Sequence, residues 1–454
     1  MTGGSIIHRI AVLLFALSCV STSAFSVPLA GGSGISALPA TSSAGSVADP
    51  LPQKAAAIIL NRNARSVTKD LIPLAQSIFG VDHVFVPSTE QDAREAAAAT
   101  LNYRLVIPVG GDGTLSSLVN YMCEALALDP SDAMPHLPFM GYIPMGTGNG
   151  VGSVVGCRLP KRGLYRSKRR KMRQLKVIME QLRQVGQDLL FVDIQASNYS
   201  IVEMPMMQVL PHSKDECSNN TNTAPLCFFA GVGFDSLMLN DFKTLKAWSE
   251  RTGVLKRALG SITGYCVALV AMTLPQCVLQ NKHQIHVTLT TRRSNKETLW
   301  IDHRRGDFAE VVGDDGDGQE TLLYQGAAGI LAAGTSPFYG GGLRLFPFAR
   351  MYTDKMHLRL GRIHPLKGFL NIPRIFEGSY RDEEFGCLDF IGDDFEVEVR
   401  EDSDLRQQGG YPFQHSGESA GHLERFRLKV VQEPVRFISF LPKRVVVTDT
   451  PSNS

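Results

Sequence analysis

A short glycine-rich run joins an apolar segment to a patterned helix and carries a single carboxylate. Residues 109–115 read Val-Gly-Gly-Asp-Gly-Thr-Leu. The apolar residues 105–107 before the run are typical of a parallel strand covered on both faces, and those after it keep helical spacing. Glycines let the backbone approach an anion, and the first amides of a helix point free N–H groups at it. The run predicts a phosphate site, although a plain strand-to-helix turn has the same pattern.

A second glycine loop follows about thirty residues later. Residues 143–150 read Ile-Pro-Met-Gly-Thr-Gly-Asn-Gly, again an apolar segment that enters a loop of small and polar residues. Loops at the carboxyl ends of neighbouring parallel strands face one crevice, so both loops could close on the same nucleotide. Neither loop is a P-loop, because no Gly-Lys-Ser/Thr follows, and neither fits the dinucleotide fingerprint.

Together the two loops resemble the diacylglycerol kinase and sphingosine kinase superfamily. The catalytic domain of that superfamily carries Gly-Gly-Asp-Gly-Thr and then Pro-x-Gly-Thr-x-Asn. The resemblance extends from about residue 55 to about residue 442. It includes Asn61 after the first strand, the run 231–235 that is similar to a Gly-Phe-Asp segment, the glycines 340–342, and Gly417-Glu418 near the end.

Four positions depart from the family pattern. Arg62 stands where Pro is usual, Gly150 where diacylglycerol kinases usually carry Asp, Lys355 where Gly is usual, and Ser416 where Asp normally precedes Gly-Glu. The small residue at position 150 favours the sphingoid-type branch. The departures also leave open a catalytically silent protein that binds a lipid or a nucleotide.

The resemblance implies ATP and Mg²⁺ as cofactors and assigns roles to individual residues. Asp112 is the leading carboxylate for Mg²⁺, directly or through water, and Glu418 is the best candidate for the base, with Asp112 as its rival. Asp235 is expected to orient the lipid headgroup. The residues expected at the nucleotide are Asn61, Gly110, Gly111, Gly113, Thr114, Gly146, Thr147, Gly148 and Asn149.

Each of these side chains also has an ordinary structural reading. Asp112 could stabilise its own turn, and Glu418 could be a loop glutamate without a role. Asp235 could be a helix N-cap. Asn61 and Asn149 could close turns at strand ends, and the glycines 340–342 could form a tight β turn.

The elements around the two loops predict an α/β N-terminal domain with a Rossmann-like parallel sheet, which the resemblance makes NAD kinase- or diacylglycerol kinase-like. Strands are expected at 55–60 and 83–86, a helix from about 67 to 79, and a second helix opened by a capping box of Ser88 and Gln91. From about residue 208 apolar residues alternate, which predicts a β-rich C-terminal domain of sandwich type. Alternating triplets are 285, 287, 289; 395, 397, 399; and 426, 428, 430.

The expected domain boundaries follow from these changes of pattern. A leader covers 1–24 and a transit peptide or linker 25–53. The ATP-binding domain covers 54–207 and the lipid-substrate domain 208–434. The segment 435–454 could return to the N-terminal domain.

Composition and length limit the classes of protein to which the chain can belong. The 454 residues include 46 Lys and Arg against 44 Asp and Glu, a formal net charge of +2, so a nucleic-acid partner is not expected. The length exceeds one typical core and suits two domains plus a leader. Eight cysteines lack metal-type spacing and predict no disulfide framework.

The leader has the marks of a signal peptide. Arg9 precedes an apolar run at 10–20, which is shorter than the roughly 20 residues that span a bilayer, and small residues follow. Cleavage after Ala24 would expose Phe25, which resembles the two-part leaders of secondary plastids. Residues 25–48 have no acidic residue but also no Arg or Lys, so entry to the secretory pathway stays an alternative to the plastid.

A basic segment is the candidate membrane contact. Residues 161–173 contain eight basic residues, among them Arg169, Arg170 and Lys171, and apolar residues continue behind them at helical spacing. Such a segment could lie on anionic lipid, or it could be a solvated insertion whose apolar stripe packs on the sheet.

The expected function is that of an ATP-dependent lipid kinase that phosphorylates a hydroxyl of a diacylglycerol or a sphingoid-type lipid. Its lipid substrate would be met at a peripheral membrane surface. The alternative enzyme is NAD kinase, which shares Gly-Gly-Asp-Gly but lacks the second glycine loop in this form. The sequence does not predict the acceptor lipid or the oligomeric state.

Overall fold

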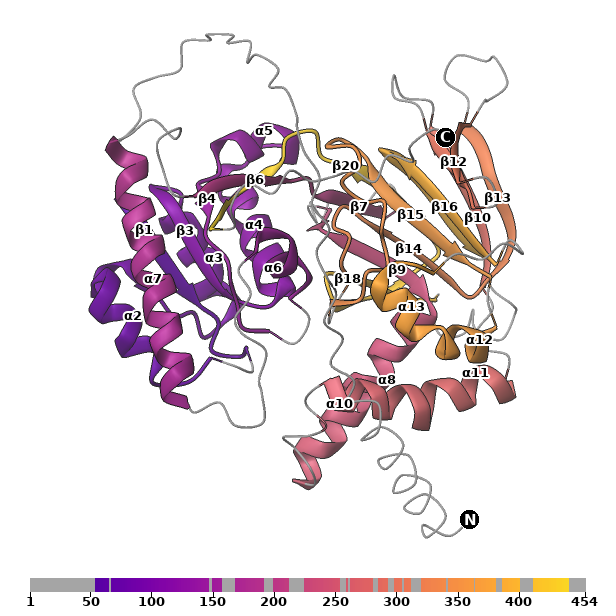
Figure 1. Ribbon diagram of the computed structural model, residues 1–454, viewed down its shortest axis with the longest axis horizontal. Coiled ribbons are helices and arrows are strands. Elements are labelled where there is room, and N and C mark those ends of the chain that lie inside the picture. Colours follow the sequence, from indigo (N-terminus) through magenta and orange to yellow (C-terminus); the bar gives the residue numbers. More distant parts are fainter. Residues whose placement is uncertain are drawn as a thin grey trace.

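A seven-stranded sheet with helices on both faces forms the N-terminal part of the chain (Figure 1). Its order is β2-β1-β3-β4-β21-β6, with β5 also paired to β3. All pairs are parallel except β21 with β6, so the predicted parallel α/β layer is confirmed and has one antiparallel edge strand. The strands are β1 Lys54–Leu60, β2 Val84–Phe85, β3 Tyr103–Gly110, β4 Phe139–Met140, β5 Ile143–Pro144, β6 Ser200–Met204 and β21 Val435–Ser439.

The computed structural model describes most of the chain after residue 53. The described residues are 54–64, 67–146, 149–156, 168–191, 199–211, 224–253, 259, 262–280, 285–292, 298–303, 306–311, 320–339, 342–362, 364–380, 386–400 and 411–440. The expected leader, Thr147, Gly148, residues 340–341, the first part of the basic segment and residues 441–454 lie outside them. Within these ranges no helix combines the length and apolarity needed to cross a bilayer.

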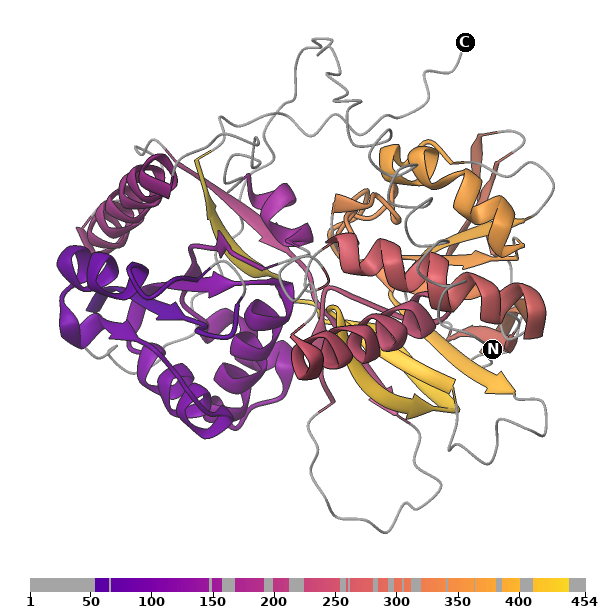
Figure 2. The ribbon, with the colours of Figure 1, turned by 90° about the horizontal axis from the view of Figure 1, so that it is seen from below.

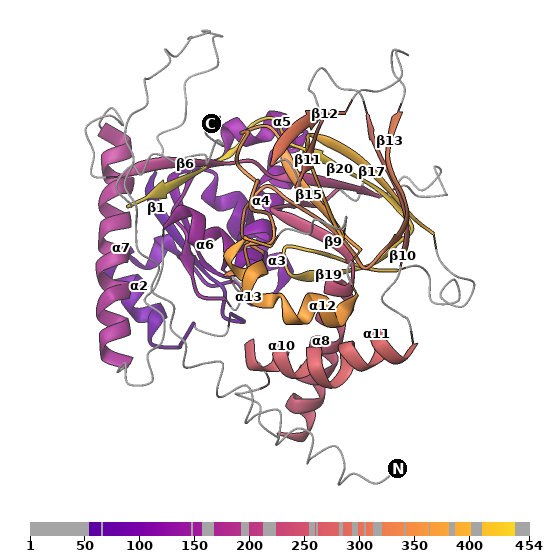
Figure 3. The ribbon, with the colours of Figure 1, turned by 45° about the vertical axis from the view of Figure 1, so that its right-hand side comes forward.

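Two helix pairs cover the two faces of this sheet, and the alternation of side chains along β1 explains both contacts. Ala57 and Ile59 face the core shared with α3 and α4, whereas Ile58 and Leu60 face α2 and α7. Figure 3 shows α2 and α7 together on one side of the strands. Helix α7 lies so close that a Cβ on Gly186 would come 2.6 Å from the Cβ of Ala56. The helices are α2 Leu71–Phe79, α3 Glu90–Thr100, α4 Asp112–Leu126, α5 Pro130–Ala133, α6 Gly150–Val155 and α7 Lys168–Phe191.

Two predicted helix starts were wrong. Helix α2 begins at Leu71 and not near 67, which leaves Pro73 in the first turn, where its missing N–H costs nothing. The capping box of α3 consists of Thr89 and Asp92, not Ser88 and Gln91. Asp92 accepts the backbone N–H groups of both Ser88 and Thr89, and a carboxylate is a stronger acceptor there than the Gln91 amide.

The C-terminal part is a sandwich of two antiparallel sheets, as predicted. The orders are β13-β10-β17-β20-β7-β8 and β12-β11-β16-β15-β14-β9-β18-β19. The alternating apolar residues of both sheets enter one core, where the Phe413 and Phe426 rings meet across the sandwich at 4.9 Å between centroids. The strands are β7 Met207–Pro211, β8 Leu226–Cys227, β9 Phe229–Gly233, β10 Ile285–Arg292, β11 Leu299–Asp302, β12 Asp307–Glu310, β13 Glu320–Ala328, β14 Ile330–Gly334, β15 Met356–Gly361, β16 Cys387–Gly392, β17 Asp394–Arg400, β18 Tyr411–His415, β19 Glu418–Leu423 and β20 Arg425–Val430.

Helices at one end of the sandwich were not predicted from the sequence. They lie below the sheets in Figure 1. The longest, α8, follows β9 directly and packs against β9, β18 and β19. They are α8 Phe234–Thr252, α10 Ile262–Ala268, a π-helical turn Leu269–Thr273, α11 Leu274–Gln280, α12 Pro365–Leu370 and α13 Ile372–Glu377.

The two parts are joined by a strand and by side-chain contacts. β21 lies in the N-terminal sheet although the strands just before it belong to the sandwich; Figure 2 shows it in yellow beside the N-terminal strands. The Asn120 side chain of α4 pairs with both the N–H and the C=O of Leu226, at 2.8 and 2.9 Å. Helix α4 therefore binds the edge of the six-stranded sheet much as a neighbouring strand would.

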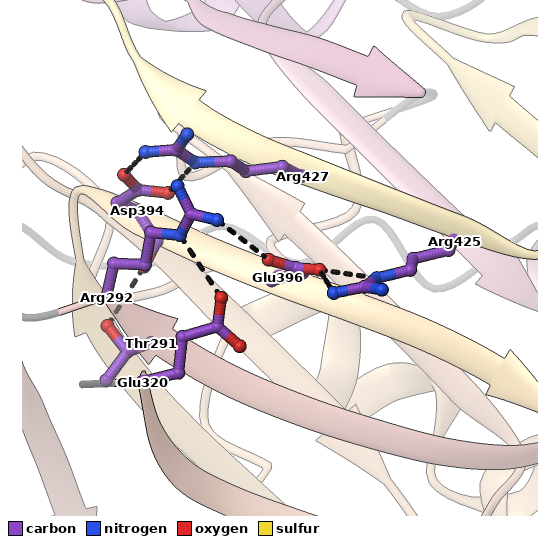
Figure 4. Close-up of polar contacts among 7 residues, drawn as sticks. All are labelled: Thr291, Arg292, Glu320, Asp394, Glu396, Arg425 and Arg427. Atoms are coloured by element: carbon purple, nitrogen blue, oxygen red, sulfur yellow. Dashed lines mark hydrogen bonds and ion pairs between the residues drawn. The ribbon is translucent and has the colours of Figure 1, made fainter. Parts of the chain in front are cut away.

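The outer face of the six-stranded sheet carries a ladder of opposite charges (Figure 4). Asp394 and Glu396 of β17 pair with Arg427 and Arg425 of β20, and Arg292 of β10 reaches Glu320 at 3.3 Å. Glu396 is only 3% exposed, because arginines cover it from both neighbouring strands. These cross-strand pairs neutralise one another and fix the register of the sheet.

A second charged group is buried inside the eight-stranded sheet. Arg359 donates to both oxygens of Asp389 at 2.7 and 2.8 Å, and His357 and His303 donate to the same carboxylate at 2.8 and 2.7 Å. Burial alone would raise the pKa of Asp389, but Arg359 and His357 outweigh it and hold that pKa well below its usual range. For His357 the balance is the opposite. Burial lowers its pKa below the usual 6.5, and the raising effect of the Asp389 charge is smaller.

This buried histidine predicts a loss of stability in acid. Below pH 6.5 the unfolded chain protonates His357 while the folded chain does not, so the free energy of unfolding falls by up to about 1.4 kcal/mol per pH unit as the pH drops toward the folded pKa. His357→Gln should flatten this slope in urea titrations between pH 7.5 and 5, whatever its effect at neutral pH. The exposed control His422→Gln should leave the slope unchanged, and an unchanged slope in His357→Gln would show the interpretation to be wrong.

Candidate functional site

The two glycine loops touch each other at the carboxyl ends of β3 and β5. The backbone N–H groups of Met145 and Gly146 both donate to the carbonyl of Gly110, at 2.7 and 3.0 Å. A Cβ on Gly146 would lie 2.4 Å from the Cα of Gly111, so the contact requires glycine. The structure thus brings the two predicted loops to one place.

Asp112, the first residue of α4, ties the loops together. It is 4% exposed, and its two oxygens accept the backbone N–H groups of Gly150 at 2.6 Å and Val151 at 3.2 Å, at the start of α6. Burial raises its pKa to about 6, although both N–H groups act in the opposite direction. The reading of Asp112 as a residue that stabilises its own turn is wrong, because these bonds reach the other loop.

Tyr142 is a site residue that the sequence did not reveal. Its buried hydroxyl lies 3.2 Å from the Gly110 carbonyl, 3.4 Å from Asp112 and 3.5 Å from Asn149. It stands among apolar residues and has the pattern of a core tyrosine. No feature of the sequence distinguishes it from one.

The two asparagines hold the shapes of the loops. Asn149 has a left-handed φ of 52°, accepts the Gly146 N–H at 3.0 Å and donates to the Gly146 carbonyl at 2.8 Å, which is the turn-closing role. Asn61 accepts the N–H of Asn63 and also donates to the Thr114 hydroxyl at 2.8 Å. Asn61 therefore links the end of β1 to the first turn of α4.

The hairpin of β18 and β19 in the C-terminal part places Glu418 beside the first glycine loop. Ser416 and Gly417, between β18 and β19, both have positive φ, 47° and 80°, as in the type I′ turn that prefers Asn-Gly or Asp-Gly. The Ser416 hydroxyl lies 2.7 Å from that of Ser116 on α4. A Cβ on Gly113 would lie 3.2 Å from Glu418 Oε1. Glu418 therefore lies beside the first glycine loop, residues 110–114, and the departure at Ser416 concerns the turn.

Asp235 lies in the first turn of α8 and is nearly buried. Its Oδ2 accepts the Tyr339 hydroxyl at 2.6 Å and the Gln414 amide at 3.1 Å, whereas its Oδ1 has no hydrogen-bond partner among the described residues. Burial raises the pKa of Asp235 above its usual value. The N-cap reading is wrong, because no side chain caps α8.

Gln414 connects Asp235 to the hairpin. While its amide N–H₂ donates to Asp235, its Oε1 accepts the backbone N–H of Gly417 at 3.2 Å. Gly417 directly precedes Glu418, so Asp235 and Glu418 belong to one hydrogen-bonded arrangement at the end of the sandwich.

Residues 168–173 of the basic segment form the start of α7. Leu175, Leu182 and Val185 are buried against the sheet, so the apolar stripe packs in the core. Arg169 and Arg170 are exposed and Lys171 is half-buried. The buried part of the stripe is therefore taken up by the core, and a membrane contact at the start of α7 would rest on its charges.

Among the described residues, a cluster in the sandwich and the Asp112 carboxylate differ in how well they could hold a metal ion. His303, Cys387 and Asp389 offer atoms within 4.8 Å of one another, but Arg359 already occupies both oxygens of Asp389 and would repel a cation. Asp112 Oδ2 keeps one lone-pair direction beyond its bond to the Gly150 amide, whereas Oδ1 accepts both the Val151 N–H and the Tyr142 hydroxyl. It fits Mg²⁺ held through water, which suits an ion that keeps several waters.

The departure at Gly150 has a steric reason. A Cβ there would lie 2.8 Å from the Phe338 carbonyl oxygen and 3.3 Å from Asp112 Oδ2. The aspartate of diacylglycerol kinases would meet a carbonyl and a second carboxylate in this chain. The absence of a side chain at this position is therefore a requirement of this packing.

Accordingly, we expect Gly150→Ala to lower the free energy of unfolding by about 1–3 kcal/mol, as overpacking in a rigid region does. Urea denaturation of the purified chain measures this. The matched control is Gly368→Ala in α12, where a Cβ meets nothing within 4 Å, so the change should be neutral or slightly stabilising. Equal stability of Gly150→Ala and the native chain would contradict the steric account.

Comparison with known proteins agrees with this geometry. Residues 55–179 match the diacylglycerol kinase catalytic domain. No match was found among curated proteins. A solved diacylglycerol kinase from Bacillus anthracis str. Sterne is 13% identical with a TM-score of 0.47, and two proteins provisionally so named from the same organism are 14% identical with TM-scores of 0.50 and 0.49. Each comparison covers 85% of this chain and 97% of the other.

The resemblance drawn from the two glycine loops is thus confirmed. The likeness at a TM-score of 0.50 extends the shared fold over both parts of the chain. The match over residues 55–179 shows that this part of the chain is similar to the catalytic domain of diacylglycerol kinases.

Proposed function

We propose that the protein is an ATP-dependent lipid kinase that transfers the γ-phosphate to a hydroxyl of a diacylglycerol or sphingoid-base-type lipid. One observation carries the proposal: Glu418, from the sandwich, lies against Gly113 of the phosphate loop. A carboxylate so placed can reach a hydroxyl that attacks a phosphate held by the loop. Phosphoryl transfer depends mainly on such positioning and on neutralisation of charge.

Each part of the chain supplies one substrate in this mechanism. The amides near Gly110, Gly111, Gly113 and Thr114 hold the phosphates, and Asn61 keeps Thr114 in place. Asp112 fixes the second loop behind them and would hold Mg²⁺ through water; when bound, the ion neutralises the phosphate oxygens. Gly146 and Asn149 shape the floor of the site.

The acceptor hydroxyl approaches from the side of the sandwich. Its oxygen forms the new bond to the γ-phosphorus, the bond to the ADP oxygen breaks, and the hydroxyl proton passes to Glu418. Asp235 has one buried oxygen without a hydrogen-bond partner in the described part of the chain, at the same end of the sandwich, and Tyr339 and Gln414 fix its direction. We assign this oxygen to a polar group of the lipid head, a hydroxyl or an ammonium.

Two substitutions test the catalytic roles. Glu418→Gln should keep ATP affinity and lose about a hundredfold or more in turnover, because the amide cannot accept the proton. Asp112→Asn should lose a comparable factor, because one amide hydrogen of the new side chain would face the Gly150 or Val151 N–H. The control is Glu250→Gln, an exposed glutamate of α8, which should turn over like the native chain.

The assay uses purified protein, ATP-Mg and a panel of lipids together with soluble NAD. Near-normal turnover in Glu418→Gln with a dead Asp112→Asn would transfer the base role to Asp112. Phosphorylation of NAD in preference to every lipid would establish the NAD kinase alternative. Nucleotide binding without turnover on any acceptor would show a silent binding protein.

The exposed charges of α7 carry a second, separable proposal, a peripheral contact with anionic membrane. Arg169→Gln, Arg170→Gln and Lys171→Gln together should weaken binding to vesicles of acidic lipid and lower activity on membrane-embedded substrate. Activity on detergent-dispersed lipid should stay unchanged. Binding of the native chain should also fall with salt, because exposed charges are screened over about 8–10 Å. Vesicle binding that ignores both salt and the substitutions would refute the contact.

A further inference from the structure

Lys243 of α8 points its ammonium group at the proposed base. Its Nζ lies 3.6 Å from Glu418 Oε2, while the other oxygen of Glu418 faces Gly113. Lys243 is 42% and Glu418 64% exposed, so this ion pair contributes little to folding stability. The pair places a positive charge at the edge of the phosphate loop, on the side from which the acceptor must come.

The phosphate loop itself has no cation to offer. Residues 105–157, which contain both glycine loops and α4 and α6, include no lysine and no arginine. Amides and a helix dipole can hold phosphates, but the charge that develops on a transferred phosphoryl group is usually met by Arg, Lys or a metal ion. A basic side chain for this purpose has to come from another part of the chain.

The neighbours of Lys243 support this placement. His415 lies beside it, and burial first and the Lys243 charge second lower the pKa of His415, so the imidazole is neutral at pH 7. The lysine ammonium is therefore the cation that pairs with Glu418 in the described part of the chain. An ammonium has three donors, enough to contact a carboxylate and a phosphate oxygen together.

We propose that Lys243 is a catalytic residue that contacts the γ-phosphate of ATP bound at the glycine loop and neutralises its charge during transfer. The inference rests on the proposed kinase function and deepens it. The base accepts a hydrogen bond from the attacking hydroxyl, and the oxygen of that hydroxyl bonds to the γ-phosphorus. A cation that pairs with the base therefore also lies near the γ-phosphate oxygens. α8 of the sandwich thus completes a site whose loops come from the N-terminal part.

Arg62 is the competing cation and provides the contrast. It is exposed in the turn after Asn61, which donates to the Thr114 hydroxyl, so Arg62 comes from the end of β1 in the N-terminal part, whereas Lys243 comes from α8. A contact there would be to the phosphates held by the loop and shared by ATP and ADP. We therefore expect Lys243 to increase the affinity for ATP over that for ADP, and we expect no such difference from Arg62.

The test measures nucleotide affinity of the full chain by calorimetry, with Mg²⁺ and either ADP or a non-hydrolysable ATP analogue. Lys243→Met should weaken the analogue about tenfold and ADP less than about twofold, as expected for one lost charge-assisted contact. Lys243→Arg should restore most of the difference. Lys246→Met, an exposed lysine of the same helix, is the matched control and should change neither affinity.

Binding without a lipid keeps this inference separate from the proposed function. If no lipid is phosphorylated but Lys243→Met still loses discrimination between the analogue and ADP, the kinase proposal fails and the γ-phosphate contact stands. In the Glu418→Gln background the effect of Lys243→Met should persist; its disappearance would make Lys243 a positioning residue for Glu418. Equal affinities in Lys243→Met and the native chain, or discrimination lost in Arg62→Gln instead, would overturn the proposal.

Discussion

The buried carboxylate of Asp112 is the interaction on which the site depends. It accepts two backbone N–H groups from the start of α6, while the Gly110 carbonyl accepts two more from the second loop. A buried anion is costly unless it is hydrogen-bonded, and these amides satisfy it only because Gly150 has no side chain. The raised pKa of about 6 shows that the cost of burial is not fully compensated. Such residual strain is typical of functional sites.

The contacts between the two parts of the chain determine which side chains of the sandwich lie near the Asp112 loop. Ser416 meets Ser116 across 300 positions of sequence, Asn120 binds the edge of β8, and β21 returns to the N-terminal sheet. The last two contacts join the two parts elsewhere, and the Ser416–Ser116 bond fixes the hairpin of β18 and β19 against α4. The position of Glu418 relative to Gly113 therefore follows from packing of the whole chain, and not from a flexible loop.

Much of this arrangement could be predicted from the sequence because it depends on local patterns. The glycine runs, the apolar strand segments and the alternating residues of the sandwich each specify their element or face through side-chain periodicity. The prediction that the two loops meet followed from parallel-sheet topology and is confirmed by the contact between Gly111 and Gly146. The family motif then brought together Asp112 and Glu418, which no local pattern relates.

The parts that were missed depend on long-range contacts. Tyr142 has an apolar neighbourhood in the sequence, and only the fold places its hydroxyl between the loops. The bonds of Asp235 to Tyr339 and Gln414 span 104 and 179 positions, so the sequence could not show them and left an N-cap open as the alternative to a headgroup contact. Apart from α8, the helices beside the sandwich are short, and the π-helical turn after α10 breaks the 3.6-residue period that would reveal them.

The charged side chains are distributed unequally between the two parts of the chain. The glycine loops provide amides and one buried carboxylate but no lysine or arginine, whereas the sandwich and α8 provide Glu418, Lys243 and Asp235 around the same point. Under the proposed function, the N-terminal part holds the nucleotide. The base Glu418 and the cation Lys243 both belong to the part that receives the lipid. The contacts that hold the two parts together therefore also fix Glu418, and Lys243 beside it, at the first glycine loop.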